Sequence, residues 1–219
     1  MHRLSTIVSS RLSCICPSVY ISKRSTYVAY LLIIGTIELN PGPVSTQLNF
    51  GLINARSAVK KASLIHDVIA DYRLDLLVIT ETWIPSDAPN AVKLDTAPSG
   101  YRIVHAHRGT AAEGRGGGIA VVYRETVNLS VVDFGHFGEF ESLFVKINSS
   151  ESPVIVSCIY RIPGSVSTAF CNDISDILEQ LMLSDKRYIV CGDFNCPGGE
   201  DATIDDHLND VLLRYNHQQ

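Results

Sequence analysis

The chain has 219 residues, of which 46% are hydrophobic, so it can bury a sizeable core and is not expected to be disordered. Residues 1–47 hold four basic residues and one acidic residue, a net charge of +3, and because the whole chain carries −5, the remainder carries −8. An acidic domain binds nucleic-acid phosphate poorly by itself, so phosphate chemistry on this chain would need a bound cation. The six cysteines lack the spacing of a zinc site or of a disulfide framework, which favours an intracellular protein, nuclear or cytoplasmic.

Residues 1–47 form a basic leader that we do not expect to be part of the fold. Residues 1–26 contain no acidic residue and are followed by an apolar run, "YVAYLLIIGTI" at 27–37. The run is shorter than the about 20 residues that a membrane-spanning helix requires, so we expect no membrane span. Targeting directed by the leader is the alternative to an untargeted intracellular location.

The leader ends in "GTIELNPGP", whose two prolines exclude helix and strand and mark a boundary. This stretch resembles the C-terminal tail of the ribosome-skipping peptides of viruses and some retrotransposons. The resemblance implies that the bond between Gly42 and Pro43 is not made, so that Pro43 begins a separate product. Thr36 stands where those peptides usually carry an acid, and a plain linker turn is the alternative interpretation.

From residue 48 onward, the hydrophobic pattern is that of an α/β domain. It predicts a strand over 47–54, a helix over 58–73 and a buried strand over 74–82, which together form a β-α-β unit.

The second half of the domain begins with strands predicted over 117–124, 140–148 and 152–163. No helix is predicted between them, which favours antiparallel pairing and a mixed sheet. A helix with a Ser or Thr cap over 167–185, a strand into "GDFN" and a last helix near 203–215 follow.

Polar residues stand at the ends of four predicted strands: Asn54, Glu81, Tyr160, and the pair Asp193 and Asn195. Side chains two apart on a strand share a face, so Asp193 and Asn195 should project together while Phe194 turns the other way. In α/β proteins, the loops beyond strand ends are where catalytic groups gather.

These residue types suit the hydrolysis of a phosphodiester. Glu81 is a hard oxygen ligand for Mg²⁺ or Mn²⁺, and Asp193 could orient or deprotonate an attacking water. The amides of Asn54 and Asn195 and the hydroxyl of Tyr160 could donate to phosphoryl oxygens. Taken singly, each residue also fits a turn or a solvated surface position.

In chain order, the motifs "NARS", "TETW", "RGGG", "FESL" and "GDFN" resemble the endonuclease/exonuclease/phosphatase superfamily. The chain looks most like the apurinic-endonuclease-like domain of non-LTR retrotransposons, over about residues 48–216. The resemblance implies a two-layered mixed β-sandwich flanked by helices and a divalent-metal nuclease that nicks DNA. It implies that Asn54 and Glu81 occupy the metal site, that Tyr160 contacts the phosphate, and that Asp193 and Asn195 position the nucleophile.

Two arginines next to these motifs are candidate DNA contacts. Arg56 lies beside Asn54, and Arg115 precedes three glycines that let the backbone approach a ligand closely. An ordinary solvated arginine is the alternative interpretation for both.

The superfamily continues beyond "GDFN" to a closing "SDH" motif, whereas the given chain stops at Gln219. Asp206 and His207 lie in a segment with helical spacing, so we expect His207 on a helix surface and not in catalysis. We therefore expect residues 48–219 to be a C-terminally truncated domain with little activity. A non-catalytic remnant and another phosphodiesterase or phosphatase of the superfamily are the alternatives, and the sequence carries no signal for an oligomeric state.

Overall fold

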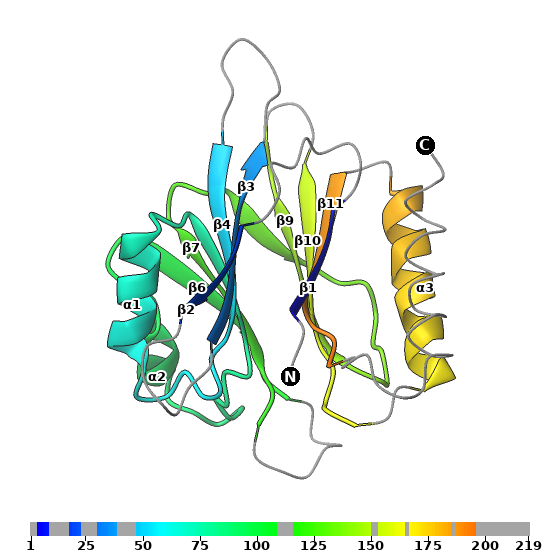
Figure 1. The fold of residues 1–219 in the computed structure, drawn as a ribbon, viewed down its shortest axis with the longest axis horizontal. Coiled ribbons are helices and arrows are strands. Elements are labelled where there is room, and N and C mark those ends of the chain that lie inside the picture. The colour runs from blue at the N-terminus through cyan, green and yellow to red at the C-terminus, as the bar shows by residue number, and fades with distance from the viewer. Residues whose placement is uncertain are drawn as a thin grey trace.

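The computed structural model describes residues 4–8, 18–22, 30–38, 47–108, 116–149, 153–164, 167–184 and 187–195. In this part of the chain, two mixed β-sheets pack face to face, with α1 and α2 on one outer face and α3 on the other (Figure 1). The predicted α/β class and the two-layered sandwich flanked by helices are confirmed.

One sheet, called here the β10–β11 sheet, contains the following strands in spatial order: β1 (Leu4–Val8), β11 (Arg187–Asp193), β10 (Val154–Tyr160), β9 (Glu141–Ile147) and β8 (Leu129–Val132). The other, called the β4–β5 sheet, contains these strands in spatial order: β2 (Ser18–Ser22), β3 (Tyr30–Glu38), β4 (Gln47–Asn54), β5 (Leu76–Thr80), β7 (Ile119–Arg124) and β6 (Tyr101–Ala106). Strands β4 and β5 pair in parallel, as do β10 and β11.

Each parallel pair is joined by a helix that crosses the outer face of its sheet. Helix α1 (Ala62–Asp71) joins β4 to β5 and buries Ile65 and Ile69. Helix α3 (Thr168–Leu183) joins β10 to β11, and its predicted cap is Ser167, whose hydroxyl accepts from the backbone N–H of Phe170 at 3.1 Å. The unit around α1 was predicted, whereas around α3 only the order of strand, helix and strand was predicted and not the parallel pairing of β10 with β11. Both units bring the carboxyl ends of the paired strands to the same edge.

The antiparallel part of the fold differs from the prediction. Strands β9 and β10 pair as expected, but β7 lies in the other sheet, between β5 and β6. Strands β6 and β8 and the short helix α2 (Asn90–Asp95) were not predicted from the sequence. Strands β6 and β8 are half-buried edge strands without strong apolar alternation, which is the signal on which strand prediction depends.

The leader contributes strands, contrary to our expectation. Strand β1 pairs antiparallel with β11, and β3 pairs antiparallel with β4. A strand edge offers unpaired N–H and C=O groups, which explains why the apolar run of the leader adds to the sheet. The stretch 39–46 with "NPGP" and the predicted helix near 203–215, with Asp206 and His207, lie outside the described residues. Among the described helices, none has the length and apolar character to cross a membrane.

The core between the sheets is built from alternate residues of each strand. On β4 these are Leu48, Phe50 and Leu52, and on β11 they are Ile189 and Cys191. The next positions of the same rows are Asn54 and Asp193, so the apolar layer between the sheets ends in polar side chains.

Candidate active site

Four strand ends meet at one end of the layer between the sheets. In the β4–β5 sheet, Asn54 is the last residue of β4 and pairs with Thr80, the residue before Glu81. In the β10–β11 sheet, Tyr160 and Asp193 are the last residues of their strands and lie opposite each other. The predicted site residues therefore come from different sheets to one place.

The side chain of Asn54 joins the two carboxylates of the site. Its Nδ2 donates to Oε1 of Glu81 and to Oδ2 of Asp193, each at 2.7 Å. All three residues are buried, with relative exposures of 7% for Asn54, 8% for Glu81 and 0% for Asp193. The Oδ1 atom of Asn54 accepts from the backbone N–H of Arg56 at 3.1 Å, which fixes the orientation of the amide.

This donor set fits a hard divalent cation. Buried carboxylates need partners, and Mg²⁺ takes one or two carboxylates together with water and substrate phosphate oxygens. Because Glu81 and Asp193 accept from the same amide nitrogen, their carboxylates are close enough together to share one cation. Within the described ranges, no group of three or more His, Cys, Asp or Glu side chains forms a cluster that could hold a metal, so these two carboxylates would be the charged ligands. The place of Asn54 among the ligands stays a prediction, since its amide here orients both carboxylates.

Asp193 and Asn195 are held by the turn that follows β11. The backbone N–H of Asn195 donates to Oδ1 of Asp193 at 3.2 Å, and Asn195 adopts a φ of +46°. The ring of Phe194 points the other way, as predicted, and meets Phe170 of α3 in an edge contact at 6.4 Å. The amide Nδ2 of Asn195 donates to the backbone carbonyl of Arg161.

Arg161 is a buried residue that supports the candidate site and was not predicted from the sequence. It is 5% exposed, and its guanidinium donates to the carbonyls of Phe194 at 2.8 Å, of Asn195 at 2.6 Å and of Gly164 at 2.9 Å. One buried side chain thus fixes the turn that carries Asn195. Its place directly after Tyr160 was the only sequence signal for this role.

Tyr160 is 3% exposed, and several carboxylates lie near its side chain. Burial raises the pKa of Tyr160 strongly, and the negative charge of Glu81 raises it further. The cation of Arg108 opposes this shift, while Glu141 and Asp193 add to it. The phenol therefore stays protonated at neutral pH and can donate a hydrogen bond to a phosphate oxygen.

Glu141 and Arg108 form an ion pair next to Tyr160, and this pair was not predicted from the sequence. Glu141 lies opposite Tyr160 in the register of β9 and β10. Its Oε1 accepts from Nε of Arg108 at 2.7 Å, and its Oε2 accepts from the backbone N–H of Gly118 at 2.5 Å. Glu141 thus ties the β10–β11 sheet to the loop before β7 in the other sheet.

Three backbone segments run side by side past the strand ends of the β4–β5 sheet. The N–H of Ser57 donates to the carbonyl of Glu81 at 2.8 Å, and that of Trp83 donates to the carbonyl of Gly117 at 2.9 Å. Glu81 and Trp83 both have a φ of +54°, a conformation that is uncommon for residues other than glycine. Such outliers persist where the surrounding bonds impose them, and they cluster at functional sites.

Of the two arginines predicted to contact DNA, one lies within the described residues. Arg56 is exposed beside the site and has a φ of +43°, whereas Arg115 lies outside the described residues. Lys61, which was not predicted, donates to the carbonyls of Ala55 at 2.7 Å and of Arg56 at 2.9 Å. Burial and the charge of Arg56 lower the pKa of Lys61, while Glu81 raises it.

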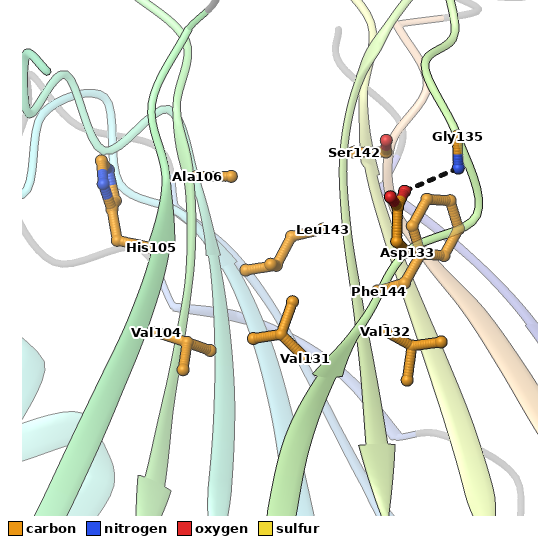
Figure 2. Close-up of a pocket in the computed structure, with 10 residues that line it drawn as sticks. All are labelled: Val104, His105, Ala106, Val131, Val132, Asp133, Gly135, Ser142, Leu143 and Phe144. Carbon is orange, nitrogen blue, oxygen red and sulfur yellow. Dashed lines mark hydrogen bonds between the residues drawn. The ribbon is translucent and has the colours of Figure 1, made fainter.

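A separate cavity of about 480 Å³ lies between the edge strands β6 and β8. Figure 2 shows Val104, Ala106, Val131 and Leu143 around its apolar part, with Asp133 hydrogen-bonded to the N–H of Gly135 at one side. None of the predicted site residues lines this cavity. The cavity is thus an opening of the apolar layer and not the carboxylate site.

Comparison with known proteins identifies the fold. Residues 47–214 match the Endonuclease/Exonuclease/phosphatase family. A search of curated protein sequences found no match.

Solved structures of similar fold include enzymes that act on nucleic acid. The 3′ phosphatase NExo from Neisseria, bound to a product DNA hairpin, is 16% identical with a TM-score of 0.53, over 77% of this chain and 71% of that chain. The endonuclease domain of TRAS1, a telomere-specific non-LTR retrotransposon, is 16% identical with a TM-score of 0.51, over 76% of this chain and 68% of that chain. An endonuclease/exonuclease/phosphatase family protein from Leptotrichia buccalis is 12% identical with a TM-score of 0.51, over 74% of this chain and 73% of that chain. At these identities the likeness concerns the fold.

Proposed function

Because this chain belongs to the Endonuclease/Exonuclease/phosphatase family, we propose that it is a divalent-metal-dependent phosphodiester hydrolase that cuts DNA as a retrotransposon-type endonuclease inside the cell. The observation that carries the proposal is the convergence of Glu81 and Asp193, from different sheets, on the amide of Asn54. Mg²⁺ or Mn²⁺ held by these carboxylates would stabilise negative charge on the phosphate.

The residues of the chain have distinct roles in this proposal. Asp193 is fixed by Asn54 and by the N–H of Asn195, so its carboxylate can orient an attacking water and accept its proton. Tyr160 keeps its proton and can donate to a phosphoryl oxygen as charge develops there. Arg161 acts indirectly, by holding the turn of Asn195.

The assignment to retrotransposon-type endonucleases is supported by the sequences of the motifs more than by the fold. The fold is shared with exonucleases and phosphatases, whereas "NARS", "TETW" and "GDFN" in this order are typical of retrotransposon endonucleases. DNA is therefore the proposed substrate, and a phosphatase or another phosphodiesterase is the alternative that an assay must separate.

The test is the nicking of supercoiled plasmid by the whole chain in Mg²⁺ and in EDTA. We expect slow nicking in Mg²⁺, in keeping with the little activity expected from the sequence, its loss in EDTA, and a further decrease of about 10² to 10⁴-fold for Asp193→Asn or Glu81→Gln. Asp176→Asn, at an exposed position on the outer helix α3, is the matched control and should nick normally. Nicking that survives both EDTA and Asp193→Asn would overturn the proposal, as would release of phosphate from a 3′-phosphorylated oligonucleotide without any nicking.

We also propose that "GTIELNPGP" lets the ribosome skip the bond between Gly42 and Pro43. The match of the motif supports this, and skipping would place β3 and β4, which pair from Glu38 and Gln47, on separate products. Translation with a reporter at each end should give two products. A single fused product, also after Thr36→Asp, would reduce the motif to a linker.

A further inference from the structure

Trp83 is an exposed aromatic residue at the rim of the carboxylate site. It is the single tryptophan of the chain and is 39% exposed, although it lies only two residues after the buried Glu81. Its backbone N–H donates to the carbonyl of Gly117 at 2.9 Å, and its φ is +54°. The backbone of Trp83 is thus fixed to a neighbouring segment, while its indole stays partly exposed, without the burial that usually stabilises a tryptophan.

Arg108 lies next to this indole. A β-carbon placed on Gly116 would lie 3.6 Å from Nε1 of Trp83 and 3.7 Å from Nη1 of Arg108, so both side chains border the space above this glycine. Glu141 holds the guanidinium through Nε at 2.7 Å, while Nη1 and Nη2 lie toward Gly116. The absence of a side chain at residue 116 keeps that space open.

The same arginine is close enough to the site to act on it electrostatically. The positive charge of Arg108 lowers the pKa of Tyr160 against the effect of the surrounding carboxylates. Arg108 is therefore near both groups: it pairs with Glu141, which lies opposite Tyr160 in the sheet, and it borders the space above Gly116 together with the indole. Glu141 offsets the charge of Arg108, so a phosphate would be recognised through the N–H groups of Nη1 and Nη2, which lie toward Gly116, more than through net charge.

We propose that Trp83 and Arg108 form a nucleotide-binding subsite beside the carboxylates, in which a base of a single-stranded segment stacks on the indole and its phosphate binds the guanidinium. Aromatic stacking accepts any base, because every base has a π-face, and arginine binds phosphate through paired N–H groups. The subsite deepens the proposed function on which it rests, because it selects polynucleotides over small phosphate esters that carry no base.

Tryptophan fluorescence, excited at a wavelength that tyrosine does not absorb, tests the subsite directly, because Trp83 is the single tryptophan among the chain's fluorescent residues. The whole chain carrying Asp193→Asn, which slows turnover, is titrated in Mg²⁺ with a single-stranded oligonucleotide and separately with inorganic phosphate. We expect saturable quenching by the oligonucleotide and none by phosphate. Arg108→Gln should weaken the oligonucleotide about 10-fold. Arg102→Gln, at a mostly exposed arginine of β6, is the matched control and should bind normally.

Binding of a dye-labelled oligonucleotide, measured by anisotropy, gives the second readout. Trp83→Ala should weaken it about 10-fold, and Trp83→Phe, which keeps a ring for stacking, should restore most of the affinity. Unchanged affinity in Trp83→Ala, or equal quenching by phosphate and oligonucleotide, would overturn the subsite while plasmid nicking still supports the nuclease. If neither oligonucleotide binding nor Mg²⁺-dependent nicking is seen, the proposed function fails and the subsite fails with it.

Discussion

The two sheets build their halves of the active site in different ways. In the β10–β11 half, Asp193, Asn195 and Arg161 are buried, with exposures of 0%, 3% and 5%, and a single guanidinium holds the turn. In the β4–β5 half, the segments that follow the strand ends are joined by hydrogen bonds from backbone N–H to backbone carbonyl. The side chains of Arg56 and Trp83 are exposed there.

The difference separates a rigid half from an adaptable half. Close packing and a buried charge tolerate little change, whereas exposed side chains on a bonded backbone can be exchanged at small cost. We therefore expect the turn after β11 to be rigid and the exposed rim of the β4–β5 half to meet the substrate, while the groups of the chemistry come from both halves. Matched substitutions in the two halves test whether their rigidity differs.

Gly192→Ala should have the largest effect on stability. Gly192 lies within β11 with a φ of +149°, and a β-carbon there would overlap the backbone of Ile159 in β10. Because the backbone of a paired strand cannot yield, we expect the free energy of unfolding to fall by about 3 to 5 kcal/mol. Urea unfolding measures this, with Gly138→Ala, where a β-carbon meets no atom within 4 Å, as the control. Equal stability of the two variants would contradict a rigid half.

Arg161→Met should come next. It keeps the length of the side chain but leaves the carbonyls of Phe194, Asn195 and Gly164 without this donor. We expect a loss of about 2 to 4 kcal/mol in the free energy of unfolding, together with reduced nicking. Arg102→Met removes an exposed ion pair of 3.9 Å and should change stability by less than about 0.5 kcal/mol. Comparable losses in both variants would show that the buried arginine has no special role.

Gly117→Ala should cost less than Gly192→Ala, although its φ is also positive, at +73°. Here a β-carbon would overlap the ends of the Glu141 and Arg108 side chains, which can move away. We expect a loss of about 1 to 2 kcal/mol in the free energy of unfolding, with the pair of Arg108 and Glu141 broken. A loss as large as that of Gly192→Ala, in the same urea experiment, would mean that the β4–β5 half is equally rigid.

The smallest effect concerns pH and His105 of β6, whose Nε2 lies 2.9 Å from Oγ1 of Thr82. Burial, and then the charges of Lys93 and His107, lower the pKa of His105 to about 4. The unfolded chain then takes up a proton near pH 6.5 and the folded chain does not, so stability falls as the pH decreases from about 6.5 to 4.

Because His105 is partly exposed, we expect this loss to be about 1 kcal/mol at pH 5. Thermal unfolding at pH 7 and pH 5 measures it, and His105→Gln should reduce the difference. His136→Gln, at an exposed position, should leave it unchanged. If His105→Gln keeps the full pH dependence, another group is responsible.

Much of the site could be predicted because its residues end regular patterns. Asn54, Tyr160 and Asp193 each follow an apolar strand, and the motifs around them fix their order. Arg161, Glu141 and Lys61 could not be found in this way, because their partners are backbone carbonyls, a backbone N–H and a distant side chain. Such partners are set by how the turns pack, and no periodic signal reports that.

The same reasoning applies to the fold. The parallel units around α1 and α3 have continuous apolar strands, so their order was clear from the sequence. The edge strands β6 and β8 are half-buried and their pattern is weak. The leader strands follow from open edges on β4 and β11, which exist only once the sheets have formed.

The position of Asn54 and Asp193 at the ends of inward-facing rows has a consequence for assembly. A slip of one residue in the pairing of β4 or β11 would turn that side chain to the opposite face of its sheet. A cation shared by Glu81 and Asp193 could then no longer form its bonds. The metal would bind only the sandwich whose strands pair in the correct register. By mass action, metal binding would then favour correct strand pairing during folding.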